Sequence, residues 1–369
     1  MGGDVMNTSN RRIVYNTDCE GPTVRNDNAF EAACHFIPGG QVLFEQLSLF
    51  DDYTAYVKKR PQYNAGDTLR LLLPFLKAAD VTDIQFAKWT RHKGINWMDG
   101  AKETLAFARE QHLATFEISA SYRPFAALVA SAVRIPAENI YCTDLNLGRF
   151  EMTRAEAQRV SKIAEEIVEL PTLSKTEVRT SARRVSKRQQ DAFDTCDRLI
   201  WDKLAAEPCS AQILSEVRAM GGTEKRAAIF DAIRRAGAVP SDAVYVADSI
   251  TDVEAFRELR HRGGVTIAFN GNEYAVEAAE YAAWGLSSLV NAVLLAVFVA
   301  DGREGLTRFC DSGGKEKRRN EFVVTVLEKL EASGLPWGCA RVSKRNLARV
   351  VGMSGKFRKE TRDAAALLS

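Results

Sequence analysis

The sequence predicts an α/β protein, in which a parallel sheet carries helices on both faces. Five short apolar runs are typical of strands: RRIVYN, LATFEIS, ENIYCTDL, DAVYVADS and GGVTIAFNG. Between them lie stretches with apolar residues at helical spacing, such as GAKETLAFAREQH. Strands that alternate with helices indicate a parallel, three-layer, Rossmann-like fold. In such folds ligands bind at the carboxyl ends of strands. Asp18, Ser119 and Asp248 each follow an expected strand.

The composition is that of an ordinary soluble protein. The 369 residues carry a formal net charge of +2, so no global field points to nucleic acid or to acidic lipid. The opening MGGDVMNTSN lacks the apolar core of a signal peptide, and the apolar stretch at 289–300 is shorter than the ~20 residues that cross a bilayer. Seven cysteines without a CxxC pair predict neither a zinc site nor a disulfide framework. We therefore expect a cytoplasmic protein with no membrane partner.

The chain divides into a core and several additions. Residues 11–27, 96–150 and 218–300 are expected to form the α/β core. Residues 28–95 are rich in aromatics at helical spacing and predict a helical cap insert, and residues 151–217 predict a second helical insert. The second insert fits either a further cap or an oligomerisation arm. The basic extension, 301–369, fits packing on the core or on a second subunit, so a homo-oligomer remains an alternative.

The polar residues at the expected strand and helix ends suit phosphate chemistry. They are Asp18 and Glu20, Ser119, Lys225, and Asp248 with Asp252. Clustered carboxylates repel one another unless a cation lies among them, and hard oxygen ligands suit Mg²⁺. A carboxylate can also attack phosphorus to form an aspartyl-phosphate, while a hydroxyl and an ammonium hold the phosphoryl oxygens. Together these residues predict a site for a small phosphorylated substrate.

The ordered set resembles the haloacid dehalogenase (HAD) superfamily, and especially its phosphoserine-phosphatase-like phosphatases. The first family motif, a strand followed by Asp-x-Asp-Gly, is similar to DCEG at 18–21. The second, a strand ending in Ser or Thr, is similar to TFEIS at 115–119, and the third is a lysine near a helix start, here Lys225. The fourth, an apolar strand before Gly-Asp-x-x-x-Asp, is similar to VYVADSITD at 244–252. The resemblance covers about residues 11–27, 95–150 and 220–285.

The resemblance implies a Mg²⁺-dependent phosphatase with an aspartyl-phosphate intermediate. Asp18 would be the nucleophile and a metal ligand, and Glu20 the general acid and base, with its backbone carbonyl on the metal. Ser119 and Lys225 would hold the phosphoryl oxygens. Asp248 would bind Mg²⁺, and Asp252 would support the metal directly or through water. Asn270, in AFNGN, is a further candidate for the phosphate pocket, with a Gly/Asn turn as the alternative.

Two departures leave alternatives open. The family usually has Asp where this chain has Glu20. The extra methylene of glutamate moves the carboxyl by about one bond, a displacement that can alter catalysis. The alternative is therefore a phosphotransferase with altered acid–base chemistry. Ser121 competes with Ser119 for the second motif, because strand alternation places both on one face.

The segment from Lys175 to Gln190 carries six basic residues and one acid, a net charge of +5. A scaffold that binds nucleic acid or protein through that segment and the tail ranks last, since the segment lacks aromatics for stacking on bases.

Overall fold

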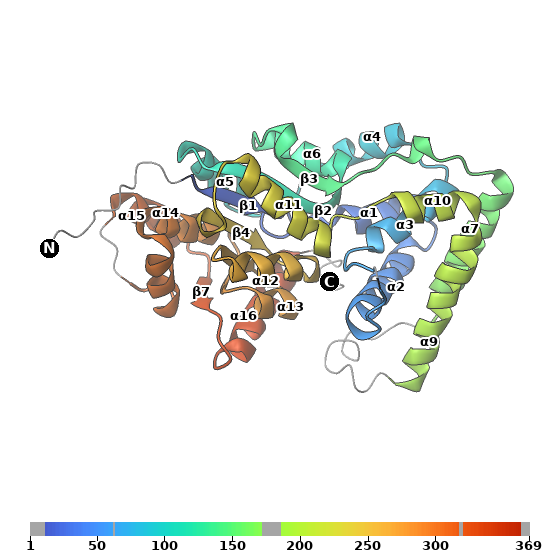
Figure 1. Cartoon of the computed structure of the whole chain (residues 1–369). Coiled ribbons are helices and arrows are strands. Elements are labelled where there is room, and N and C mark those ends of the chain that lie inside the picture. The colour runs from blue at the N-terminus through green and yellow to red at the C-terminus, as the bar shows by residue number, and fades with distance from the viewer. Residues whose placement is uncertain (1–11, 62, 172–185, 317–319, 363–369) are drawn as a thin grey trace.

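The computed structural model describes residues 12–61, 63–171, 186–316 and 320–362. One seven-stranded sheet runs through the middle of the core, in the order β3-β2-β1-β4-β5-β6-β7 (Figure 1). All neighbouring strands are parallel except β6 and β7, which are antiparallel. The strands are β1 (Val14–Thr17), β2 (Ala114–Tyr122), β3 (Ile140–Thr143), β4 (Ala243–Ala247), β5 (Val265–Phe269), β6 (Tyr281–Gly285) and β7 (Trp337–Arg341).

Helices cover both faces of this sheet, as the sequence predicts. One face packs against α5 (Ala101–Glu110), α6 (Arg123–Ala132), α14 (Leu289–Asp311) and α15 (Glu321–Ala332). The other packs against α11 (Gly222–Arg235), α12 (Val253–His261), α13 (Glu273–Ala278) and α16 (Leu347–Thr361). Along β4, Val244 and Val246 point to the first layer and Tyr245 to the second, because side chains alternate along a strand. The three-layer α/β prediction is confirmed.

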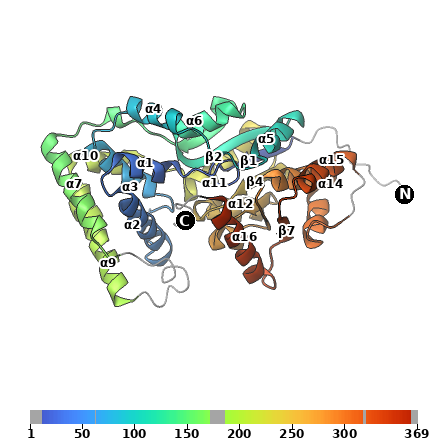
Figure 2. The ribbon, with the colours of Figure 1, turned by 180° about the vertical axis from the view of Figure 1, so that it is seen from behind.

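The two inserts form a single helical unit beside the sheet (Figures 1 and 2). Its helices are α1 (Asn28–Phe36), α2 (Gly40–Asp52), α3 (Thr68–Ala78), α4 (Asp83–Lys93), α7 (Arg154–Val168), α9 (Lys187–Arg198) and α10 (Pro208–Glu216). Residues of both inserts share one apolar cluster, in which Phe50 and Leu72 lie with Ile163. The rings of Tyr53 and Phe193 stack with centroids 3.9 Å apart. Burying these faces against each other gives the unit a core of its own.

Short helical turns connect the longer elements. They span Tyr53–Val57, Ala137–Asn139, Leu147–Arg149, Leu199–Lys203, Leu204–Ala206, Pro240–Asp242 and Ile250–Asp252. The last of these follows β4 and carries the second acid of the VYVADSITD segment into the site.

The C-terminal extension belongs to the core. Helix α14 runs across the expected boundary at residue 300 and changes direction at Gly302, whose φ of 65° favours glycine. Strand β7 extends the sheet, and α16 packs on it through the buried Val350 and Phe357. Of the two alternatives for the extension, the structure shows packing on the core. Among the described residues, no helix is both long enough and apolar enough to span a membrane.

Candidate active site

The candidate site lies where the order of the strands reverses. Strand β1 pairs with β2 on one side and with β4 on the other, so the chain leaves this point in opposite directions. Loops at the carboxyl ends of the strands diverge there and leave a crevice for ligands. Asp18 follows β1 and Asp248 follows β4. The backbone N–H of Asp18 donates to the carbonyl of Val246 over 2.9 Å, which ties the first loop to the neighbouring strand.

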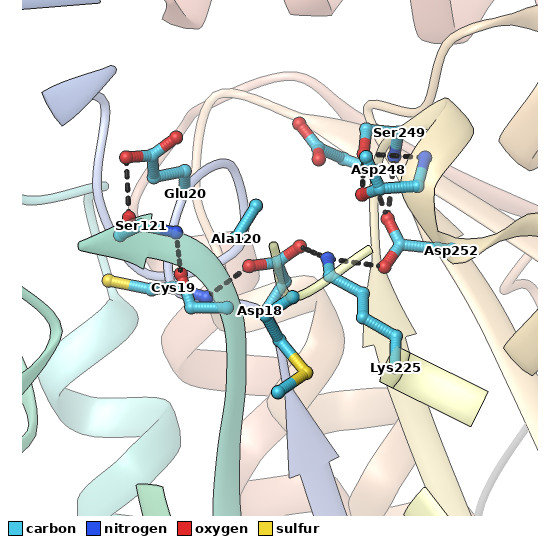
Figure 3. A network of polar contacts seen from close by, with 12 residues as sticks. Asp18, Cys19, Glu20, Ala120, Ser121, Lys225, Asp248, Ser249 and Asp252 are labelled. Carbon is cyan, nitrogen blue, oxygen red and sulfur yellow. Dashed lines mark hydrogen bonds and ion pairs between the residues drawn. The ribbon is translucent and has the colours of Figure 1, made fainter. Parts of the chain in front are cut away.

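A buried ion-pair network joins three of the predicted residues (Figure 3). The ammonium of Lys225, which is fully buried, lies 2.5 Å from Asp18 Oδ2 and 2.6 Å from Asp252 Oδ1. The other oxygen of Asp18 accepts from the backbone N–H of Cys19 over 2.7 Å. Burial raises the pKa of Asp18 to about 7, and the positive charge of Lys225 opposes that shift. Lys225 therefore favours the ionised form of Asp18, which is the form that a nucleophile requires.

Asp252 is held on both of its oxygens. Its Oδ1 accepts from the Tyr245 hydroxyl over 2.5 Å as well as from Lys225, and its Oδ2 accepts from the Ser249 N–H over 3.0 Å. The side chain is fully buried. In this arrangement, Asp252 holds Lys225 in position.

Three carboxylates converge closely enough to hold one metal ion. Asp18, Asp248 and Asp252 each offer an oxygen within 4.8 Å of the others, and all three side chains are buried. Hard, anionic oxygens are the donors that Mg²⁺ prefers. The residues therefore fit a divalent cation. Asp18 and Asp248 line the cavity at this edge and Asp252 does not, so Asp18 and Asp248 are the better candidates for direct ligands.

Glu20 lies on the opposite side of the crevice from Lys225 (Figure 3). Its Oε1 accepts from the Ser121 hydroxyl over 2.6 Å and from the Asn28 N–H over 2.9 Å. Burial and the negative charge of Asp27 raise the pKa of Glu20 to about 8, and the charge of Arg362 opposes the shift. Glu20 is thus protonated near neutral pH, as a general acid needs to be.

Gly21 is required by the turn that follows. Its φ of 100° lies in the region that favours glycine, and a Cβ there would come within 2.3 Å of Asp248 Oδ2. The absence of a side chain allows the first loop to approach the fourth motif. The DCEG segment therefore combines two acids with the glycine that brings them against Asp248.

A cavity of about 90 Å³ opens over these groups. Its floor is formed by Asp18, Glu20, Ser121 and Asp248 at the sheet edge. Its cover comes from the helical unit, with Phe44, Ser48, Asp51 and Asp52 of α2 and Thr68 and Leu69 of α3. A ligand in this cavity would lie between the sheet and α2, partly shielded from bulk water.

Asp51 makes the stability of this cover depend on pH. Burial first, and then the charges of Asp67 and Asp52, raise the pKa of Asp51 from 3.8 to about 8. A carboxyl with a raised pKa in the folded state stabilises the fold at low pH, and that contribution is lost as the pH rises toward 8. Between the ordinary pKa of 3.8 and the raised pKa of about 8, we expect the free energy of unfolding to fall as the pH rises. Asp51 contributes at most about 1.4 kcal/mol per pH unit to this fall.

Urea denaturation at pH 5 and at pH 8.5 measures the effect. Asp51→Asn, which keeps an acceptor for the Gly66 N–H and the Thr68 hydroxyl, should lose this part of the pH dependence and exceed the wild type in stability at pH 8.5. Glu110→Gln, at an exposed carboxylate on α5, is the control and should leave the pH dependence unchanged. An Asp51→Asn protein with the wild-type pH dependence would contradict the assignment.

The two serines of the second motif lie differently. Strand β2 continues past the expected end at Ile118 to Tyr122, with a register shift against β3 in its last residues. Ser119 is fully buried, and its Oγ accepts from the N–H of Ser121 over 3.1 Å. Ser121 lines the cavity and contacts Glu20, whereas Ser119 does not line it. The geometry therefore favours Ser121 for contact with a ligand, where sequence reasoning preferred Ser119.

Asn270 takes the structural alternative. Its Nδ2 donates to the carbonyl of Gly285 over 2.9 Å, and its Oδ1 accepts from the Gly285 N–H over 3.0 Å. Its φ of 46° places it in a left-handed turn, which asparagine tolerates. Asn270 joins the ends of β5 and β6 and does not line the cavity.

Sequence reasoning missed two arginines of the site, Arg358 and Arg362. Both come from α16 and its C-terminal end, and both donate to Asp248 Oδ2, over 2.5 Å and 2.8 Å. They are separated from Asp248 by 110 and 114 residues along the chain. The only sequence signal is the basic run KFRKETR, which is equally typical of a solvated helix.

The whole chain shares its fold with a solved archaeal protein. The structure of gene product AF1437 from Archaeoglobus fulgidus matches with a TM-score of 0.75 and 23% sequence identity, over 96% of this chain and 98% of that chain. A substrate-bound complex of phosphoserine phosphatase matches with a TM-score of 0.44 and 13% identity, over 74% of this chain and 93% of that chain. The second likeness is too low to carry an inference. No protein-family model and no curated protein matches the sequence.

Proposed function

We propose that this protein is a Mg²⁺-dependent phosphatase of the HAD type that hydrolyses a small phosphate monoester through an aspartyl-phosphate. One observation carries the proposal. Asp18, at the carboxyl end of β1, pairs with the buried Lys225 and lies close to two further acids, Asp248 and Asp252. A carboxylate held this way is available for attack on phosphorus, and its neighbours suit the charge of a phosphoryl group.

In the first step, an oxygen of Asp18 attacks the phosphorus of the ester, and the bond from phosphorus to the leaving oxygen breaks. Glu20, which is protonated at neutral pH, gives its proton to that leaving oxygen. The products of the step are an alcohol and an aspartyl-phosphate on Asp18. Lys225 stabilises Asp18 before the attack and stays within reach of the phosphoryl group after it.

In the second step, Glu20 acts in the reverse sense. Its carboxylate takes a proton from a water molecule, whose oxygen attacks the phosphorus and releases inorganic phosphate from Asp18. The Ser121 hydroxyl and the Asn28 N–H hold Oε1 of Glu20 in place for both proton transfers. Ser121, the residue before the last one of β2, thus supplies a hydrogen-bond partner for the longer glutamate side chain.

A bound Mg²⁺ would neutralise charge on the phosphoryl oxygens during transfer. Asp18 and Asp248 would hold it, and Asp252 would support the site by fixing Lys225. The cover formed by α2 would limit the bulk water that could compete with Asp18 for the phosphorus in the first step. The helices α2 and α3 that line the cavity opposite the sheet edge favour a small phosphorylated metabolite over a phosphoprotein.

The experiment is a phosphate-release assay on the purified full-length chain. We expect hydrolysis of p-nitrophenyl phosphate with Mg²⁺, and little or none after treatment with EDTA, because no divalent cation would then offset the charge on the phosphoryl oxygens. A panel of phosphorylated sugars, amino acids and nucleotides then identifies the preferred class. Failure to release phosphate from p-nitrophenyl phosphate and from every panel member with Mg²⁺ present would contradict the proposal.

A further inference from the structure

The carboxylate that a metal would use at the end of β4 already has cations of the chain beside it. Asp248 Oδ2 accepts from the guanidinium of Arg358 over 2.5 Å and from that of Arg362 over 2.8 Å. Both arginine side chains are only 5% exposed. Pairs removed from water in this way are much less screened by solvent than surface pairs. Asp248 is therefore neutralised from within the protein.

Arg358 is the more firmly anchored of the two. Its guanidinium also donates to the backbone carbonyl of Asp248 over 3.0 Å and to that of Asn270 over 3.4 Å. It follows Phe357, which packs in the core beneath α16. Arg358 thus belongs to the framework that joins α16 to the loops after β4 and β5.

Arg362 instead faces the cavity. It follows the last residue of α16, and it lines the cavity together with Asp18 and Glu20. Its guanidinium lies 3.6 Å from Glu20 Oε2, so it bridges Glu20 and Asp248. Its guanidinium also donates to the carbonyl of Asn26 over 3.4 Å. Arg362 therefore places one positive charge between Glu20 and Asp248.

The charges around Arg362 determine how readily a metal ion can bind to Asp248. Around this position lie the carboxyl groups of Asp18, Glu20, Asp27, Asp248 and Asp252, and they already face three cations, Lys225, Arg358 and Arg362. A divalent cation bound to Asp248 would lie close to the guanidinium of Arg362, and like charges at that range repel.

We infer that Arg362 and a divalent cation compete for Asp248, so that the C-terminal end of α16 sets the metal affinity of the site. The inference rests on the proposed function only in assuming that the site takes a divalent cation. Metal loading then requires Arg362 to leave Asp248, while Arg358 remains. If Arg362 instead only oriented Asp248 toward the metal, its presence would increase the metal affinity of the site, and its removal would weaken metal binding.

Metal binding measured directly distinguishes the two roles without an activity assay. Full-length protein is freed of metal with EDTA and desalted, and its affinity for Mn²⁺ is measured by titration calorimetry and by the loss of the free-ion electron paramagnetic resonance signal. Arg362→Gln should bind Mn²⁺ at least about tenfold more tightly than the wild type, as expected when a like charge a few ångströms away is removed. Arg362→Lys, which keeps the charge, should stay within about threefold of the wild type.

Lys359→Gln provides the matched control, since it removes one positive charge from an exposed position on the same helix. It should leave the affinity for Mn²⁺ unchanged. Urea unfolding of each variant verifies that the fold is intact. Unchanged or weaker binding by Arg362→Gln overturns the inference alone. No Mn²⁺ binding by any of these proteins overturns the inference and the metal requirement of the proposed function together.

Discussion

Replacing Asp18 with Asn is expected to reduce kcat for the hydrolysis of p-nitrophenyl phosphate by about 10³-fold or more, a loss typical of removing a catalytic nucleophile. Asparagine is nearly isosteric, and its oxygen can still accept from the Cys19 N–H. What it lacks is the anionic oxygen that attacks phosphorus and pairs with Lys225. Steady-state kinetics with Mg²⁺ measures the loss. Acid quenching of the wild type during turnover, followed by mass spectrometry, tests for a phosphoryl group on Asp18.

The structure offers a matched control for this change. Asp144 also follows a strand of the same sheet, β3, but its side chain is exposed and it does not line the cavity. Asp144→Asn should therefore retain wild-type kcat. Phosphatase activity that survives in Asp18→Asn, or a phosphoryl group found on another residue of the wild type, would rule out Asp18 as the nucleophile.

The residues at strand ends were predictable because their positions depend on local patterns. An apolar run identifies a strand, and an acid that closely follows the run lies at the carboxyl edge of a parallel sheet. Asp18 and Asp248 follow from this rule, and the structure brings them together beside β1 and β4. Lys225 was placed by the start of a helix, and it reaches the same edge because α11 packs across β1 and β2.

The arginines of α16 could not be predicted in this way. Their partner, Asp248, lies more than a hundred residues earlier in the chain, and no pattern within KFRKETR distinguishes Arg358 and Arg362 from the exposed Lys359. Only the packing of β7 against β6, and of α16 against that edge, brings them to the site. The same limit applies to Ser119 and Ser121, since the true end of β2 depends on its pairing with β3.

The helical inserts show a similar division. The aromatic residues of 28–95 at helical spacing predicted a helical insert, and Phe44, Phe50 and Phe75 do lie buried in an apolar cluster between its helices. That both inserts contribute to one core depends on contacts between distant segments, such as Tyr53 with Phe193, which periodicity does not reveal. Most of the basic segment from Lys175 to Gln190 lies outside the described residues, so its role stays a prediction.

Lys225→Met is expected to lower the free energy of unfolding by about 3–5 kcal/mol and to abolish hydrolysis, because a buried ion pair is broken from one side. Lys225 is fully buried, and methionine fills a similar volume without the charge. Asp18 and Asp252 would then lie close together in the interior with no cation between them. Urea denaturation at pH 7 measures the loss of stability, and Arg226→Met, at the exposed neighbouring position on α11, is the control.

A second substitution separates the structural effect from the catalytic one. In Lys225→Met with Asp252→Asn, one of the two unpaired charges is removed, so the double variant should be more stable than the sum of the single effects by about 1–3 kcal/mol. Hydrolysis should remain lost, because Asp18 still lacks the cation that opposes its raised pKa. Strictly additive stabilities would show that Lys225 and Asp252 are not coupled. Recovered hydrolysis would show that Lys225 supports only the fold, since Asp18 and Asp248 would then suffice for the chemistry.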